Sequence, residues 1–451
     1  MKKALLFFGV LLFGLTSFSQ GELTLYNMRS LPQVVTQNPA FTPYSRFHFS
    51  LPIVSGVAVG FANNTVSFDR LLDVESILTT ELEENADLFN GLYDDLDPDQ
   101  NFAAADMQVD LLRFGFKIGW NYFGFAATEK ISAFATFPKS IFELIDPSFS
   151  LTNGFAPISV SNASLSLTHY REYSFTYSRK VLEVLTVGAS AKYLYGMENI
   201  DVQNVSLEVS SVNSGGLIPD LQMNGSAQVN SSLGLLPQLN GDTADFDLGR
   251  YGAGFANSGL GFDFGARLEV LDRFTISASV LDLGSINWKE NPNNFDSEIN
   301  VAFSQEELAK DSGSTDGFFL TLLDTTVGGV ENGITKEAYN QALTPKLNLG
   351  FGVSLTDRID LNVLSYTVLS EIPRSYIMLG TNIRIRNSVN LLLNYSASNV
   401  SVESVGFGLS FNLGALQLYA ITDDLVSIAT FGNNLNGRIG INFTFSNDFE
   451  D

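Results

Sequence analysis

Few residues in this chain have the types and spacing that catalysis requires. The 451-residue sequence holds two histidines, His48 and His169, and no cysteine. A nucleophile needs a base within hydrogen-bonding reach, and no Ser or Asp motif surrounds either histidine. We therefore expect no enzyme, no catalytic residue and no cofactor.

The pattern closest to a metal site lies in an acidic stretch. Three aspartates have the alternate spacing of a calcium loop: Asp95, Asp97 and Asp99. Asp106 stands at the twelfth position, but it is shorter than the usual Glu, and Gln100 replaces the turn-making Gly. Ten acidic residues lie between Asp73 and Asp99, without a Lys or Arg. A solvated acidic loop is the better interpretation, so the three aspartates are a weak candidate, and the spacing of leucines over 71–82 predicts an amphipathic helix in the same loop.

A second set of ionisable residues occupies alternate positions in otherwise apolar segments. Their parity places them on the inner face of a barrel: Arg46, His48, Arg113, Lys117, Lys192, Asp263, Arg267, Glu269, Asp282 and Arg438. They would contact a solute or a plug, or they would pair with one another and fill a narrow lumen. The paired network is the simpler interpretation, because buried charges need partners.

The elements that position these residues are long strands with one apolar face. Val405, Phe407 and Leu409, for example, alternate with small or polar residues, and successive side chains of a strand point to opposite faces. Fourteen strands are expected: near 46–61, 106–118, 121–137, 164–178, 184–200, 260–271, 273–283, 345–356, 359–370, 376–385, 388–396, 403–413, 415–421 and 437–445. Glu129 falls on the lipid-facing parity, so a bulge or break is possible in 121–137.

The connections fall into two length classes. Tight connections are expected at 119–120, 179–183, 271–273, 357–358, 386–387 and 413–414. Long connections are expected at 62–105, 138–163, 201–259, 284–344 and 422–436. Outer-membrane barrels show this asymmetry, with tight turns in the periplasm, whereas soluble sandwiches have no reason to. The sequence therefore predicts an all-β transmembrane antiparallel barrel over 46–451, with both termini periplasmic. Short helices are expected within the long extracellular inserts, at Gln305–Lys310 and Lys336–Leu343.

The ends of the chain indicate an exported protein. Residues 1–20 combine two lysines, a short apolar run and a small-x-small site, which predicts a cleaved signal peptide. Beyond it no apolar run approaches the roughly 18 residues of a membrane helix. The last strand ends in outward residues of the kind the barrel-insertion machinery recognises: Ile439, Ile441, Phe443 and Phe445. A net charge of −24 argues against nucleic acid as a partner.

Several segments resemble an uncharacterised family of Bacteroidota outer-membrane proteins, a domain of unknown function. That family resembles a branch of the long-chain fatty-acid transporter superfamily of fourteen-stranded barrels. The segments are 37–41, 187–196, 259–265, 279–288, 417–424 and 438–443. In the fatty-acid transporters an Asn-Pro-Ala segment belongs to an N-terminal plug. The resemblance implies that residues 21–45 plug the lumen through Asn38, Pro39, Ala40 and Phe41.

Two functions remain open, besides a purely structural barrel with no conductance and no stable partner. The first is a passive channel that takes up a hydrophobic or amphipathic small molecule. The second is a non-conducting accessory subunit that binds a protein partner in a secretion or outer-membrane assembly machine, a role found among relatives in that superfamily. Fold transfers better than function between such proteins. In either case we expect contact with outer-membrane lipid and lipopolysaccharide.

Overall fold

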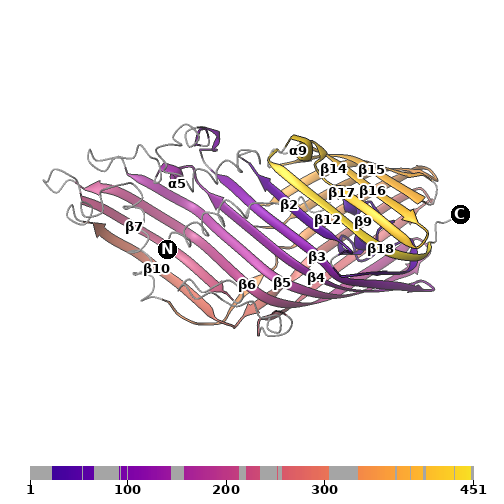
Figure 1. Cartoon of the computed structure of the whole chain (residues 1–451), viewed down its shortest axis with the longest axis horizontal. Coiled ribbons are helices and arrows are strands. Elements are labelled where there is room, and N and C mark those ends of the chain that lie inside the picture. Colours follow the sequence, from indigo (N-terminus) through magenta and orange to yellow (C-terminus); the bar gives the residue numbers. More distant parts are fainter. Residues whose placement is uncertain are drawn as a thin grey trace.

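The computed structural model describes residues 23–447 apart from 53, 65–90, 92, 99, 144–156, 213–219, 234–250, 252–255, 304–333, 371–372, 386–387, 400–402 and 431. The predicted signal peptide lies outside the described residues. The described residues form an antiparallel sheet of eighteen strands, which closes on itself because β18 pairs with both β1 and β2. Figure 1 shows the strands tilted along a long barrel, with β5, β6, β7 and β10 running on at the end away from the C-terminus.

The barrel circuit has the fourteen positions that the sequence predicted. Its strands are β1 (Ser45–Ser50), β2 (Val57–Asn63), β3 (Asn101–Ile118), β4 (Asn121–Phe137), β5 (Ile158–Leu182), β6 (Leu185–Val212), β8 (Ser258–Val270), β9 (Phe274–Trp288), β12 (Lys346–Thr356), β13 (Ile359–Val368), β14 (Arg374–Ile385), β15 (Val389–Ser398), β16 (Glu403–Leu413), β17 (Leu416–Thr422) and β18 (Asn434–Asn447). β1 and β2 share one position, since both pair with β18 and β3.

Three strands lie outside this circuit: β7 (Asp220–Ser232), β10 (Pro292–Phe303) and β11 (Tyr339–Ala342). β7 pairs with the far half of β6 and with β10, and so extends the sheet beyond the barrel. The described helices are short: α2 (Leu23–Tyr26), η1 (Pro32–Thr36), α5 (Ser140–Glu143) and α9 (Leu425–Thr430). Among the described residues, no helix is long and apolar enough to cross a bilayer.

The helix expected over Lys336–Leu343 was wrong. Tyr339–Ala342 is β11, paired with the end of β9 from Trp288 to Ser285. β12 pairs with β9 only as far as Leu281, so the last residues of β9 have backbone groups available on that edge. A strand satisfies them and a helix would not. The helices expected at Gln305–Lys310 and over 71–82 lie outside the described residues.

The first strand is interrupted where the sequence predicted one run over 46–61. β1 ends at Ser50 and β2 begins at Val57, and Pro52 between them has no N–H to give to a ladder. The wall is bridged across this gap, since the N–H of Ile441 donates to the Val54 carbonyl at 2.8 Å. The strand over 121–137 is continuous, and the bulge near Glu129 lies in the neighbouring β3, between Asp110 and Leu112.

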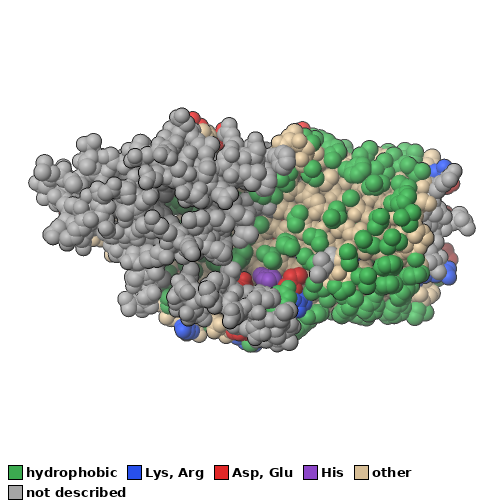
Figure 2. Space-filling view, viewed as in Figure 1, with side chains coloured by type: hydrophobic (Ala, Val, Ile, Leu, Met, Phe, Trp, Pro, Cys, Tyr) green, Lys and Arg blue, Asp and Glu red, His purple; other side chains and the backbone are tan. Residues whose placement is uncertain are grey.

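The outer face of the barrel is apolar. Large hydrophobic side chains on the outward parity are exposed, among them Ile439 at 66%, Leu260 at 60% and Ile377 at 59%. Figure 2 shows hydrophobic side chains over much of the visible barrel wall, as a broad band with charged side chains at its edges. An apolar face of this extent needs an apolar solvent or a partner to cover it.

Candidate functional site

The described N-terminal segment, residues 23–44, lies against inward-facing side chains of the barrel. The Asp423 carboxylate accepts hydrogen bonds from the N–H groups of Leu23 and Thr24, at 3.0 and 2.7 Å. The side-chain amides of Asn382 and Gln417 donate to backbone carbonyls of the segment, each at 2.9 Å. The segment therefore starts beside the long-loop end of β17 and reaches β1 only after crossing the interior.

The Asn-Pro-Ala-Phe sequence sits over two paired glycines. Asn38, Pro39, Ala40 and Phe41 are all buried. The Asn38 side chain accepts from the N–H of Ala40 at 2.9 Å, and the Ser178 hydroxyl donates to the Pro39 carbonyl. Gly188 of β6 pairs with Gly265 of β8, and a Cβ on either would clash, with Pro39 or with Asn38. Three of the segments that carried the family resemblance therefore lie together: residues 37–41 pack against residues 187–196 and 259–265.

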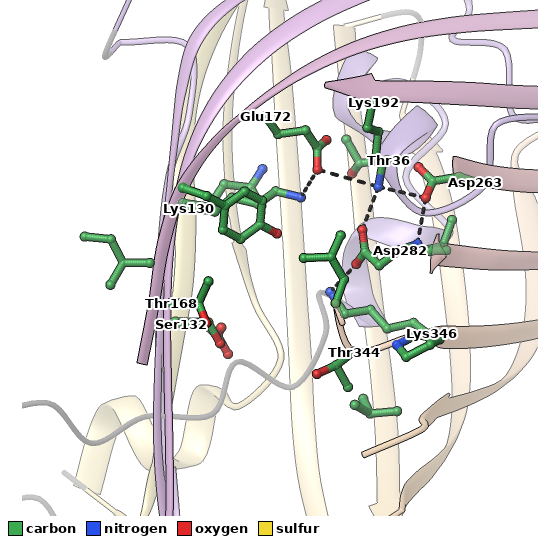
Figure 3. Close-up of a pocket in the computed structure, with 18 of the residues that line it drawn as sticks. Thr36, Lys130, Ser132, Thr168, Glu172, Lys192, Asp263, Asp282, Thr344 and Lys346 are labelled. Atoms are coloured by element: carbon green, nitrogen blue, oxygen red, sulfur yellow. Dashed lines mark hydrogen bonds and ion pairs between the residues drawn. The ribbon is translucent and has the colours of Figure 1, made fainter. Parts of the chain in front are cut away.

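Beyond this segment, three lysines and three carboxylates meet in the interior (Figure 3). The Lys192 ammonium lies 2.6 Å from Asp282, 2.7 Å from Asp263 and 3.6 Å from Glu172. The other two lysines close the ends of the chain of charges. Lys130 lies 2.8 Å from Glu172, and Lys346 lies 3.0 Å from Asp282. We call these six residues the lysine cluster.

Asp282 owes its place in the lysine cluster to an irregularity in β9. The register between β8 and β9 shifts between Phe262 and Phe264, and Asp282 lies at the shift with a φ of 59°. Few non-glycine residues take positive φ, and Asp and Asn tolerate it best. The N–H of Asp282 donates to Asp263 at 2.7 Å. The bulge thereby turns the Asp282 carboxylate between Lys192 and Lys346.

A second ionic group lies under the N-terminal segment. The fully buried Asp110 carboxylate is 3.1 Å from Arg113 and 3.7 Å from Arg438, and Gln33 of the segment donates to it at 3.5 Å. Arg113 and Arg438 were predicted to face inward, but Asp110 was missed. The bulge at Leu111 reverses the alternation of inward and outward residues along β3. Counting back from Arg113 in the sequence therefore places Asp110 on the outer face, although it lies inside.

The other residues that were predicted to face the lumen differ in how deeply they are buried. His48 is fully buried, 3.4 Å from both Ser45 and Tyr122. Arg267 pairs with Glu269. Lys117 is half-buried, and Arg46 is exposed at the end of β1. Three residues of the lysine cluster were overlooked although their parity was readable: Lys130, Glu172 and Lys346.

Glu129, which the parity of its strand placed on the lipid side, meets His169 on the outer face. Glu129 accepts from His169 and Arg171, each at 2.7 Å, and from the Tyr251 hydroxyl at 2.8 Å. Burial raises the pKa of Tyr251, which keeps the phenol a donor. The guanidinium of Arg171 also lies 4.8 Å from the centre of the Tyr251 ring. Tyr251 of the long insert is thus held against the outer wall rather than over the lumen.

The three aspartates that formed a weak calcium candidate are described only in part. Asp97 accepts from the N–H of Gln100 at 3.2 Å, and Asp106, the twelfth position of the pattern, belongs to β3. Asp99 lies outside the described residues. Within the described part of the chain, no group of three or more His, Cys, Asp or Glu could hold a metal ion.

The lysine cluster lines a cavity of about 590 Å³. Val35, Thr36 and Gln37 of the N-terminal segment border it on one side, and residues 340–346 on another. Neutral polar groups also line it, among them Ser132, Ser174 and Thr344. The described lining thus offers paired charges, hydroxyls and apolar wall.

One family matches most of the chain: "Family of unknown function (DUF5723)" matches residues 39–423. No curated protein shows significant similarity. Among solved structures, the toluene transporter TbuX of Ralstonia pickettii is 10% identical, with 96% of this chain and 95% of that one covered and a TM-score of 0.42. The toluene transporter TodX of Pseudomonas putida is 12% identical, with 95% and 93% covered and a TM-score of 0.39. A FadL homologue of Pseudomonas aeruginosa is 10% identical, with 92% and 94% covered and a TM-score of 0.41. At these values the likeness carries no argument about a substrate.

Proposed function

The chain belongs to DUF5723, a family of unknown function, and we propose from its own geometry that it is an outer-membrane barrel for passage of a hydrophobic or amphipathic small molecule. The observation that carries this proposal is the internal cavity. Its volume of about 590 Å³ falls within the roughly 300–1,000 Å³ typical of small-molecule sites. Its mixed lining suits a molecule with both polar and apolar parts.

The outer-membrane assignment rests on the outer face. A closed barrel leaves no unpaired strand edge, and an exposed apolar band around it suits a bilayer. In this proposal the tight turns lie in the periplasm and the long inserts lie outside the cell. The barrel-insertion machinery recognises β18 by its apolar outward residues. The N-terminal segment acts as the plug. It would have to shift for a solute to leave the cavity toward the tight-turn end.

A tryptophan substitution tests the cavity directly. Ser174 lines the cavity from β5, and its neighbour Phe175 is 51% exposed on the outer face. We expect protein extracted in mild detergent to carry an amphipathic small molecule, detected by mass spectrometry. Ser174→Trp should carry less of it because the indole fills the cavity, and the control Phe175→Trp should carry as much as the original protein.

The opposite outcome would favour the second candidate function. A stoichiometric protein partner, without any bound small molecule, would contradict the channel and support an accessory subunit. The observation that favours this alternative is the sheet of β6, β7 and β10, which extends beyond the circuit and offers a surface that a channel does not need.

A further inference from the structure

The ionisable lining of the cavity is balanced in sign. Its basic members are Arg113, Lys130, Lys192, Lys346 and Arg374, and its acidic members are Asp106, Glu172, Asp201, Asp263 and Asp282. Five of each leave no net charge, although the whole chain carries −24. Building on the proposed function, we infer that the cavity selects solutes without net charge, because fixed carboxylates already occupy the lysines that an anionic solute would bind.

Each lysine of the cluster has a carboxylate of the protein within hydrogen-bonding distance. The shortest separations are 2.8 Å for Lys130, 2.6 Å for Lys192 and 3.0 Å for Lys346. The Lys130 and Lys192 side chains are 20% and 5% exposed, so solvent does little to weaken their pairs. The Lys346 side chain is 37% exposed.

An anionic head group that binds such a lysine competes with the carboxylate already paired with it. The displaced carboxylate would stay buried without a cation, which is the costly state for a buried ion pair. A hydroxyl head group avoids this cost. It can hydrogen-bond to Ser132, Ser174 or Thr344 and leave the ion pairs intact.

Asp282 is the residue that sets this preference. Its two oxygens lie 2.6 Å from Lys192 and 3.0 Å from Lys346, so one side chain neutralises two ammonium groups. Asp282→Asn keeps the shape, and Asn tolerates the φ of 59°. This variant would leave Lys192 with Asp263 and Glu172, and would release Lys346 to bind an anion.

The chain contains a natural reporter for this test. Of its two tryptophans, Trp288 is fully buried and packs in a cluster with Tyr170 and Leu343, both of which line the cavity. Trp120 is 60% exposed at a tight turn. In the full mature protein carrying Trp120→Phe, fluorescence reports on Trp288 alone. Terminally brominated alkanol and alkanoate of equal chain length, which quench tryptophan over short distances, are the two probes.

We expect the alkanol to quench Trp288 at a concentration at least about tenfold lower than the alkanoate. Asp282→Asn should tighten alkanoate binding relative to alkanol binding, and continued quenching by the alkanol shows that the variant is folded. Glu269→Gln is the matched control, since it removes a carboxylate that pairs with Arg267 away from the cavity lining. It should change neither titration.

Two results would overturn the charge selection: alkanoate binding as tight as alkanol binding in the original protein, or no change in alkanoate binding in Asp282→Asn. A lack of quenching by both probes would contradict the cavity as a solute site. That outcome refutes the proposed function rather than the charge preference alone.

Discussion

Inward-facing glycines mark where the N-terminal segment touches the wall. A Cβ on Gly188 would overlap the backbone of Pro39 and Ala40, whereas a Cβ on Gly261, which also faces inward, would meet Lys192 at an ordinary 3.5 Å. The alternation of apolar residues with glycine in these strands therefore has two causes. The apolar residues face outward, and the glycines leave room for a second layer of backbone.

Gly188→Ala should loosen the N-terminal segment. The added methyl forces the backbone of Pro39 to move, and overpacking of this kind typically costs about 1–3 kcal/mol. Hydrogen exchange over residues 23–44 should rise while the barrel strands stay protected. Gly261→Ala is the control and should leave exchange unchanged. Equal exchange in both variants would show that the position of the segment does not depend on the close contact between Gly188 and Pro39.

At the level of elements, the sequence predicted every strand of the circuit, because each has one apolar face over many residues. It failed where the period of two is broken. Leu111 inserts one residue into β3 and so hides Asp110. Asp282 was predicted to face inward and does so, but the register shift beside it was not predicted. Pro52 was visible, but its effect on the first strand was not predicted. Contacts between the N-terminal segment and the wall depend on residues hundreds of positions apart, such as Leu23 and Asp423, and no local pattern encodes them.

Asp423→Asn should release the start of the N-terminal segment without unfolding the barrel. The substitution weakens the acceptor of the Leu23 and Thr24 N–H groups, and hydrogen bonds to charged groups contribute about 1.5–3 kcal/mol. Limited proteolysis should cut the segment near residue 23 faster. The neighbouring Asp424 accepts from Ser427 in α9 instead, so Asp424→Asn should leave the cleavage rate unchanged. Faster cleavage in both variants would point to a general loosening of this loop.

At the scale of the whole molecule, the apolar band reaches the tight turns themselves. Each described tight turn has a large hydrophobic side chain at or beside it that is more than half exposed: Trp120, Leu182, Leu271, Leu355 and Leu413. Leu271 is 78% exposed and holds a φ of 54°, which is unfavourable for a leucine at a turn in water. A bilayer interface that covers the turns would offset this cost, and Trp is enriched at such interfaces.

Trp120 can report how deeply the tight-turn end is immersed. In Trp288→Phe it is the sole tryptophan, and in bilayers we expect brominated lipids to quench it and aqueous iodide to leave it bright. Leu271→Asn supplies a second readout. Asn suits the positive φ, so in detergent the variant should be at least as stable as the original protein. In bilayers the variant should no longer be more stable than the original protein, because an amide replaces an apolar side chain at the interface. Strong quenching of Trp120 by iodide, without quenching by brominated lipid, would place the turns in water and confine the membrane-covered band to the middle of the barrel.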